Sequence, residues 1–381
     1  MKQILILGGG MGGLVVANEL KKKLGKEHKI ILIDKNSKHI FYPSFPWLML
    51  GLRKPEKIQK PLELLRRKGI IFVNDKITKI EPEKKMVKTT RDEFSYDYLV
   101  ISLGAELASE KIKSLSNSEY NLYQFEDVER LRDALRNFNG RKVAIVISSL
   151  PFKCPAAPYE AAFLLDYYFE KKGIRKEINL QIFTPETLPM PVAGQKIGEA
   201  IKQMLEERGI IFNPEKKINS IDGKNKIIMF ENNQKVQYDM LIYVPHHKAP
   251  DVVKNSKLTG ETGWIPVNAE TLETNQKNIY AIGDINSIKL PDGKMLPKAG
   301  VFAHYQAEVV ANNIASEIMG KNSLKEFKGD GLCFLEIGFG KAGFARGNFY
   351  AEKREINMKK PSRVWHLSKI LFEKYWFWRY F

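Results

Sequence analysis

The sequence predicts an α/β fold with two Rossmann-like domains in tandem and a C-terminal amphipathic-helix region. Three observations support this: a glycine-rich turn between a buried strand and a helix near the N-terminus, a short motif that occurs twice, and a C-terminal segment rich in aromatic and basic residues. The 381 residues are enough for two or three domains, each with its own core. The formal net charge of +17 indicates an anionic partner without identifying it.

The glycine-rich turn has the spacing of a dinucleotide site. It follows the apolar run 4–7, which predicts a buried strand, and precedes a segment with helical apolar spacing. Gly8, Gly10 and Gly13 permit, in that order, a tight turn, close approach of the backbone to a pyrophosphate, and close packing of helix on strand. The next apolar run ends in Asp34, whose carboxylate can accept hydrogen bonds from ribose hydroxyls. The first domain is therefore predicted to bind a dinucleotide.

The repeated motif indicates a duplicated dinucleotide-binding fold. The segment 96–100 (YDYLV) occurs again as 238–242 (YDMLI), and each copy would close a βαβ-type module. The predicted boundaries are 1–105 and 246–325 for the two parts of the first domain, 106–245 for the second domain and 326–381 for the C-terminal region.

The second domain lacks the features that bind a nicotinamide dinucleotide. After the apolar run 143–147, the place of the glycine-rich turn is taken by residues 148–158, which include three prolines. Side chains and a fixed proline φ obstruct the approach of a pyrophosphate, and proline removes an N–H donor. The next apolar run ends in Thr184-Pro185, which offers neither an acid for a ribose hydroxyl nor an arginine for a 2′-phosphate.

The chain has two cysteines, Cys154 and Cys333. A structural disulfide is not expected in a reducing compartment, so two unrelated core thiols are the ordinary interpretation. Cys154, however, lies in the altered turn of the second domain, at the place of a nucleotide-binding turn. The histidines predict no metal site, because His246-His247 falls in a predicted surface loop with no further ligand at metal-binding spacing.

Several segments resemble the sulfide:quinone oxidoreductases, which are flavoproteins with two dinucleotide-binding domains. Residues 151–160 and 331–338 resemble the segments that hold the family's two redox cysteines. Residues 296–300 match its Pro-Lys-x-Gly element at the flavin, and residues 45–47 follow its early Pro-Trp element. The similarity extends from Met1 to the last predicted helix and so covers nearly the whole chain.

The resemblance implies FAD as the cofactor, held without a covalent bond. Residues 96–105 and 278–284 resemble the later FAD-contact segments of the superfamily. Many members have a third cysteine about where Gln124 stands here, and its absence argues against covalent attachment. The residues implied at the FAD site are Gly8, Gly10, Gly13, Asp34, Pro46, Gly104, Asp284 and Lys298. Lys298 would lie near flavin N1 and O2, where a cation stabilises the anionic reduced flavin.

The resemblance also implies a reaction. Sulfide attacks a disulfide or a sulfur-bridged cysteine pair, after which Cys154 holds the persulfide and Cys333 passes two electrons to the flavin. Lys153 is either a solvated lysine or a cation that lowers the pKa of Cys154. A membrane quinone is the implied electron acceptor and co-substrate, contacted by Phe334, Lys369 and Phe372.

The C-terminal segment suits a membrane interface. Residues 341–381 contain ten Lys and Arg against three Glu, and residues 364–381 interleave aromatic side chains with these bases. Aromatic side chains prefer the headgroup level and cations attract anionic lipid, so such a helix lies in the interface without spanning it. A helix packed on the core and a single-stranded nucleic-acid site are the alternatives, and no nucleic acid is expected. No run of 18 uncharged apolar residues predicts a membrane-spanning helix.

The sequence thus predicts a monotopic flavoprotein that oxidises sulfide and reduces quinone at the cytoplasmic side of the cell membrane. A type II NADH:quinone dehydrogenase is one alternative, and the missing second glycine turn argues against it. A sulfide dehydrogenase flavin subunit that donates to a cytochrome is another, but such proteins are normally exported and no signal segment precedes the run 4–7. A non-enzymatic basic flavoprotein sensor is the third. A homo-oligomer is left open.

Overall fold

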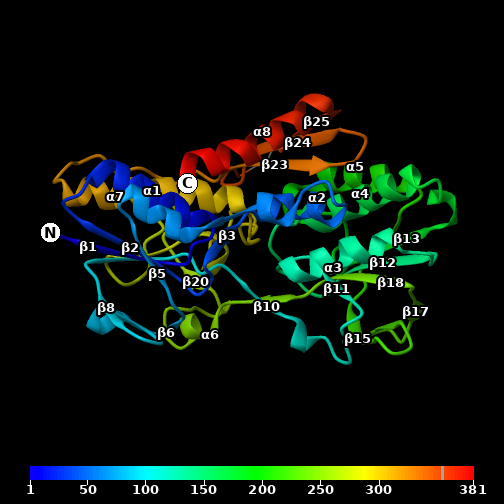
Figure 1. Cartoon of the computed structure of the whole chain (residues 1–381), viewed down its shortest axis with the longest axis horizontal. Coiled ribbons are helices and arrows are strands. Elements are labelled where there is room, and N and C mark those ends of the chain that lie inside the picture. The colour runs from blue at the N-terminus through cyan, green and yellow to red at the C-terminus, as the bar shows by residue number, and fades with distance from the viewer. Residues whose placement is uncertain (353–355) are drawn as a thin grey trace.

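The computed structural model describes residues 1–352 and 356–381, and it confirms the predicted α/β fold. Two halves lie side by side, each with a five-stranded sheet, and a long C-terminal helix lies along the outside of both (Figure 1). Two of the bases counted in the C-terminal segment, Lys353 and Arg354, lie outside the described residues.

The first half is built on a parallel sheet of strand order β21-β9-β1-β2-β5. Its strands are β1 (Gln3–Leu7), β2 (Lys29–Asp34), β5 (Ile71–Asn74), β9 (Tyr98–Ile101) and β21 (Ile279–Ala281). Strand β1 is fully buried from Ile4 to Leu7, as expected for a parallel sheet covered on both faces. Helices α1 (Met11–Leu24) and α7 (Gly300–Ile318) pack together beside it.

The second half repeats this arrangement with the order β11-β18-β12-β13-β14. Its strands are β11 (Tyr120–Asn121), β12 (Lys142–Ile147), β13 (Asn179–Phe183), β14 (Ile211–Asn213) and β18 (Met240–Val244). Its helices are α3 (Phe125–Arg136), α4 (Ala157–Lys171) and α5 (Gln195–Glu206). Each half therefore places the strand of its repeated motif beside an equivalent strand: β9 lies beside β1, and β18 lies beside β12.

The aspartate of the repeated motif explains why the motif occurs twice. The Asp97 carboxylate accepts a hydrogen bond from the backbone N–H of Gln3 at 2.8 Å, where β1 begins. The Asp239 carboxylate accepts one from Lys142 N at 2.8 Å, where β12 begins. In both halves the aspartate thus fixes the alignment of two neighbouring strands, β9 with β1 and β18 with β12.

Smaller elements surround the two sheets. Each half adds a three-stranded antiparallel sheet: β6 (Ile77–Glu81), β7 (Met86–Thr89) and β8 (Glu93–Ser95) in the first, and β15 (Ile218–Asp222), β16 (Ile227–Phe230) and β17 (Lys235–Gln237) in the second. Other short elements are β3 (Lys38–Ile40), β4 (Gln59–Pro61), α2 (Phe45–Met49), α6 (Asp251–Lys254), β20 (Ile265–Pro266) and β22 (Asn286–Ser287).

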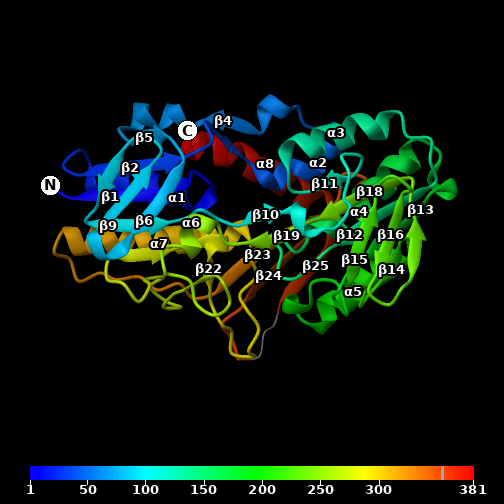
Figure 2. The same cartoon turned by 90° about the horizontal axis from the view of Figure 1, so that it is seen from below.

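The chain crosses between the halves on a two-stranded ribbon. Strands β10 (Glu106–Ala108) and β19 (His246–Lys248) pair antiparallel there (Figure 2). The predicted boundaries after residues 105 and 245 lie next to this ribbon, and the division into domains remains a prediction. The prediction of a surface loop at His246-His247 is wrong, because both residues lie in strand β19 and the side chain of His247 is buried, with its ring centroid 5.3 Å from that of Tyr123.

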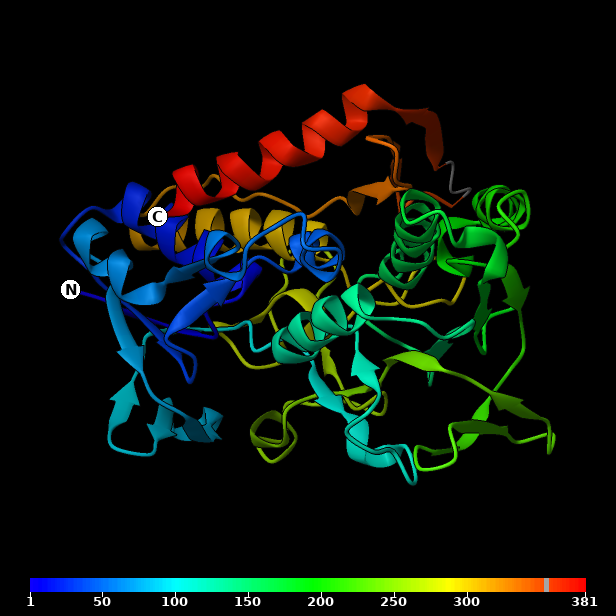
Figure 3. The same cartoon turned by 45° about the vertical axis from the view of Figure 1, so that its right-hand side comes forward.

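The C-terminal region packs on both halves. Strands β23 (Asp330–Glu336), β24 (Ala342–Asn348) and β25 (Asn357–Ser362) form a sheet that leads into helix α8 (Arg363–Tyr380). Figure 3 shows α8 running along the outside of the molecule toward α7. Trp376 and Tyr380 are buried against the first half, so one face of α8 belongs to the core.

Candidate active site

A cavity of about 800 Å³ extends from the glycine-rich turn after β1 to the cysteine turn after β12. Gly10 and Asp34 line one end, and Cys154 and Glu160 line the other. A volume of this size is within the range of small-molecule and cofactor sites.

The glycine-rich end has the shape of a pyrophosphate cradle. A Cβ atom added at Gly10 would meet no protein atom within 4 Å, so this position borders open space. Gly10 is also the N-cap of α1 and has no side chain to bind the first N–H groups of the helix. These free donors and the positive end of the helix dipole suit an anionic group. Gly13 lies outside the cavity lining, and it lets α1 pack on β1, since a Cβ there would lie 1.9 Å from Gly8 O.

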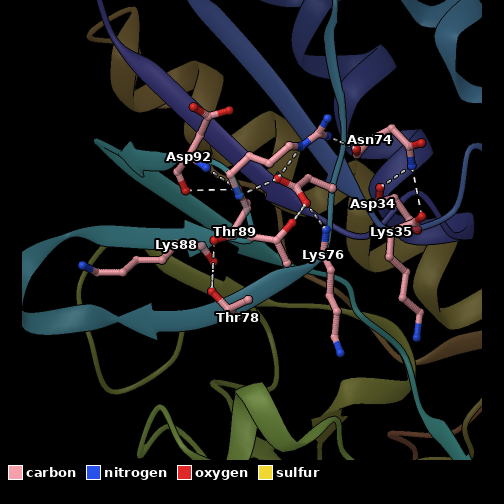
Figure 4. A network of polar contacts seen from close by, with 11 residues as sticks. Asp34, Lys35, Asn74, Lys76, Thr78, Lys88, Thr89 and Asp92 are labelled. Atoms are coloured by element: carbon pink, nitrogen blue, oxygen red, sulfur yellow. Dashed lines mark hydrogen bonds and ion pairs between the residues drawn. The ribbon is translucent and has the colours of Figure 1, made fainter.

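Asp34 is held in place at the end of β2. Its carboxylate accepts hydrogen bonds from Gly9 N at 2.6 Å and Asn36 N at 2.7 Å. Asn74 holds the backbone from the neighbouring strand, donating to the carbonyls of Asp34 and Lys35 at 3.0 Å (Figure 4). Burial raises the pKa of Asp34. The fixed carboxylate retains acceptor capacity for a ribose hydroxyl.

The other residues predicted at the FAD site also line this cavity: Gly8, Pro46, Gly104, Asp284 and Lys298. The ammonium of Lys298 donates to the carbonyls of Asp284 at 2.6 Å and Asn286 at 3.3 Å, and it lies 3.4 Å from the ring centroid of Trp264. Burial lowers its pKa to about 8, against the opposing effect of Asp284, so it remains mostly charged at neutral pH. The donors, the acid and the open cradle together fit FAD.

The cysteine turn of the second half is tied to the first half. Cys154 N donates to Lys298 O at 2.6 Å, and the Cys154 carbonyl accepts from Tyr123 Oη at 3.2 Å and from Ala157 N at 2.9 Å. The φ angle of Cys154 is 49°, which is uncommon for a residue other than glycine. The turn therefore reaches the cavity itself, where a nicotinamide-binding domain would hold a pyrophosphate.

Cys333 lies on β23, and it is not among the residues that line the cavity. Both thiols are free, and both pack against the same apolar cluster. Burial raises the pKa of Cys154 to about 12, and it also raises the pKa of Cys333, with an added contribution from the charge of Cys154. As free thiols they are therefore protonated at neutral pH.

Lys153 interacts with the charge of Cys154 but does not bring the pKa of Cys154 below its ordinary value. Its ammonium lies 4.5 Å from the ring centroid of Tyr42 and 5.7 Å from that of Tyr123. Burial of the thiol dominates, so the prediction of a lowered Cys154 pKa is wrong.

The three residues predicted to contact quinone lie around α8. Phe372 packs on Phe41, with their ring centroids 5.6 Å apart. Phe334 packs on Phe344 at 5.3 Å, and Phe344 in turn stacks on Trp365 of α8. Lys369 is one turn before Phe372, but its side chain is buried and points inward.

Lys369 is paired with a residue that the sequence did not single out. Its ammonium donates to Glu160 Oε1 at 2.6 Å, and Glu336 N donates to the same oxygen at 2.8 Å. Glu160 is buried on α4, lines the cavity and influences the pKa of both cysteines. The available signal was an acid in the first turn of a helix whose first nine residues are otherwise uncharged.

Glu186, close to the end of β13, is turned away from solvent. It accepts hydrogen bonds from Tyr159 Oη and from Thr184 Oγ1, the latter at 3.0 Å. Burial raises its pKa to about 7. It is therefore not presented to a ribose, which agrees with the loss of nicotinamide features predicted for this half.

The raised pKa of Glu186 predicts a pH-dependent contribution to stability. The carboxyl is ionised above pH 4.5 in the unfolded chain but only above about pH 7 in the folded one, so rising pH between these values destabilises the fold. The stability lost over this interval is about 3 kcal/mol. We expect Glu186→Gln to remove this loss, which urea unfolding of both proteins at pH 5 and pH 8 would show. Glu199→Gln, at an exposed position, should leave the pH dependence unchanged.

Comparisons with known proteins agree with this site. The description of the family model that matches residues 2–150 and 154–307 is "Pyridine nucleotide-disulphide oxidoreductase". The chain is 28% identical over 400 residues to a sulfide-quinone reductase of Aquifex aeolicus, covering 99% of this chain and 91% of that protein. It is 26% identical over 395 residues to the mitochondrial sulfide:quinone oxidoreductase of Mus musculus, covering 99% of this chain and 85% of that protein.

A solved structure shows the same relation. The X-ray structure of the Aquifex aeolicus sulfide:quinone oxidoreductase matches with a TM-score of 0.90 at 26% identity, covering 100% of this chain and 91% of that chain. A type II NADH:quinone oxidoreductase of Staphylococcus haemolyticus is 24% identical over 378 residues, covering 94% of this chain and 93% of that protein. The resemblance predicted from the sequence is thus confirmed over nearly the whole length. The chain belongs to the pyridine nucleotide-disulphide oxidoreductase family.

Proposed function

We propose that the protein oxidises sulfide at Cys154 and Cys333 and passes the electrons through bound FAD to a quinone. The observation that carries this proposal is the hydrogen bond from Cys154 N to Lys298 O, which brings a cysteine turn to the cavity in place of a pyrophosphate-binding turn. FAD, when bound, supplies a two-electron acceptor that can be reoxidised by quinone.

The protein's own residues have distinct parts in this reaction. Cys154 takes the sulfur and Cys333 faces the flavin, and their raised pKa values mean that a free thiol needs a nearby group to take its proton. We assign this role to Glu160, which lines the cavity together with Cys154 and whose charge acts on both thiols. Lys298 supports negative charge on the cofactor, because the carbonyls of Asp284 and Asn286 hold its ammonium at the cavity.

Quinone would approach from the α8 side. Phe334 and Phe372 offer aromatic surface there, and Lys369 offers a cation that can be drawn from Glu160 toward a quinone oxygen. These three roles are part of the proposal.

The outer face of α8 supports docking on a membrane surface. Five large side chains at helical spacing are between 48% and 77% exposed: Val364, Leu367, Leu371, Tyr375 and Trp378. Within residues 1–352 and 356–381, we find no helix with the length and apolar character needed to cross a bilayer. We therefore propose peripheral attachment to anionic lipid on the cytoplasmic side, with this stripe in the interface.

Polar substitution of the stripe should release the protein from lipid without unfolding it. Deleting α8 is unsuitable, because Trp376 and Tyr380 are core residues. We expect Leu367→Ser combined with Leu371→Ser and Trp378→Ser to lower liposome binding by at least about tenfold, since three large apolar side chains leave the interface. Sedimentation with anionic vesicles would measure this.

The control for the stripe is Leu150→Ser, which changes a side chain of similar exposure, 51%, outside α8. It should bind vesicles as the unsubstituted protein does. Undiminished binding of the triple variant would rule out α8 as the docking face.

Steady-state turnover tests the proposed function. The purified flavoprotein should reduce a short-chain quinone when sulfide is supplied and should not do so with NADH. Reduction of cytochrome c but not of quinone would favour the sulfide dehydrogenase alternative. NADH-driven quinone reduction without a sulfide-driven one would instead favour the type II dehydrogenases, to which the chain is also similar.

A further inference from the structure

We propose that a chain of ionisable side chains carries protons between the cysteine end of the cavity and the protein surface at the start of α8. Its members are Glu160, Lys369, Glu336 and His366. The inference rests on the proposed function and adds to it the route by which the quinone side obtains its protons.

The contacts run from the cavity outward. Glu160 Oε1 lies 2.6 Å from Lys369 Nζ and 2.8 Å from Glu336 N. The Glu336 carboxylate lies 2.9 and 3.1 Å from Nδ1 of His366. The side chains of Glu160, Lys369 and Glu336 are 5%, 6% and 1% exposed, whereas that of His366 is 27% exposed. His366 is therefore where the chain meets solvent.

The middle link is electrostatic and depends on the flexible lysine. Burial alone would lower the pKa of Lys369, but the carboxylates of Glu160 and Glu336 outweigh burial and hold that pKa above its ordinary value. Both carboxylates thus act on one ammonium, which carries three donors on a flexible stem. Small movements of this stem let Lys369 pass hydrogen bonds from one acid to the other.

The group has a net charge that favours one additional proton. Two carboxylates and one ammonium leave one negative charge uncompensated in a buried site, which is costly. The nearby Arg53 does not cancel it, because its guanidinium pairs with Glu373 at 2.9 Å. Arg53 and Lys369 both contact the ring of Trp47, at 4.3 Å and 4.9 Å from its centroid. The additional proton belongs between Glu336 and His366, where burial raises the pKa of Glu336.

The proposed reaction needs such a route. Conversion of HS⁻ to a cysteine-bound sulfane sulfur releases one proton and two electrons, whereas reduction of a quinone to the quinol takes up two protons and the same two electrons. One proton per turnover must therefore come from outside. Glu160 is placed to take the proton released at the thiols, and His366 is placed to bring in the second, with Lys369 between them as the donor to quinone.

The test isolates the quinone half of the reaction. FAD in the full-length protein is reduced with dithionite, so sulfide is not needed, and its reoxidation by a short-chain quinone is followed without oxygen. We expect His366→Gln to slow reoxidation by at least about tenfold. Added imidazole should restore the rate, because it can carry protons to Glu336 from the solvent side, where the side chain of His366 is 27% exposed.

A second histidine pair provides the matched control. His304 lies 3.3 Å from Glu308 on α7 and also contacts α8 through Trp376, but it is not connected to the relay. In the His304→Gln variant, quinone should reoxidise the reduced flavin at the same rate as in the unsubstituted protein. An unaffected rate in His366→Gln would overturn the relay, as would a slow rate that imidazole does not restore, since that would mean a purely structural role.

An infrared measurement tests the shared proton without turnover. The unsubstituted protein should show a carboxylic acid C=O band that titrates with pH and disappears in Glu336→Gln, and absence of this band would contradict the relay. The reoxidation and infrared measurements use no sulfide. Failure of the flavin to bleach with sulfide would therefore count against the proposed function and not against the relay.

Discussion

Replacing Cys333 with alanine should abolish the bleaching of the flavin by sulfide while FAD stays bound. Cys333 lies on β23, outside the lining of the cavity that contains the pyrophosphate cradle at Gly10, so the change removes no cofactor contact there. Without the thiol the covalent route from sulfur to flavin is lost, and we expect the bleaching rate to fall by roughly three orders of magnitude or more. Anaerobic absorbance spectroscopy after sulfide addition would measure this.

The controls for this experiment separate chemistry from packing. Cys333→Ser keeps most of the volume but is a poor nucleophile, and it should be as inactive as Cys333→Ala. Photoreduction of the bound flavin should proceed normally in both variants. A Cys333→Ala protein that bleaches at the unsubstituted rate would refute the assigned role of this thiol.

A second large effect is expected at the glycine-rich turn, where alanine substitution of two glycines of the motif should have different consequences. One substitution should lower the stability of the protein, and the other should lower its affinity for FAD. A Cβ at Gly13 would lie 1.9 Å from Gly8 O, so Gly13→Ala must push α1 away from β1. We expect it to destabilise even the FAD-free protein, by about 1–3 kcal/mol or more. Gly10→Ala meets no protein atom and has a φ of −70°, so its FAD-free stability should be unchanged while its affinity for FAD falls at least about tenfold.

Thermal unfolding of the FAD-free proteins and titration with FAD distinguish the two variants. The pair is its own control, since the substitution is chemically the same and only the surroundings differ. Normal FAD affinity in Gly10→Ala would mean that the cofactor's phosphates lie elsewhere.

Local patterns in the sequence predicted much of this architecture. The repeated motif indicated duplication. The structure adds that the carboxylates of Asp97 and Asp239 bind the backbone at the starts of β1 and β12, respectively. The proline-containing turn at Cys154 predicted the loss of a nicotinamide site. Both features depend on neighbours in sequence, where spacing translates directly into geometry.

The missed features depend on contacts between distant segments. Glu160 and Lys369 are separated by 209 positions, so no spacing rule joins them. His247 looked like a loop residue because its partner strand, β10, lies far earlier in the chain. In the aromatic tail, only packing distinguishes core residues from surface residues. Trp376 is fully buried and Trp378 is 77% exposed, although both are tryptophans of the same segment.

The proposed function requires that sulfide, acting through a cysteine pair, reduces this flavin and that a nicotinamide does not. Anaerobic stopped-flow mixing of the oxidised flavoprotein with sulfide, and separately with NADH, tests it most directly within a single turnover. We predict full two-electron bleaching with sulfide, recovery on addition of quinone, and no bleaching with NADH. Bleaching by NADH and not by sulfide would contradict the account.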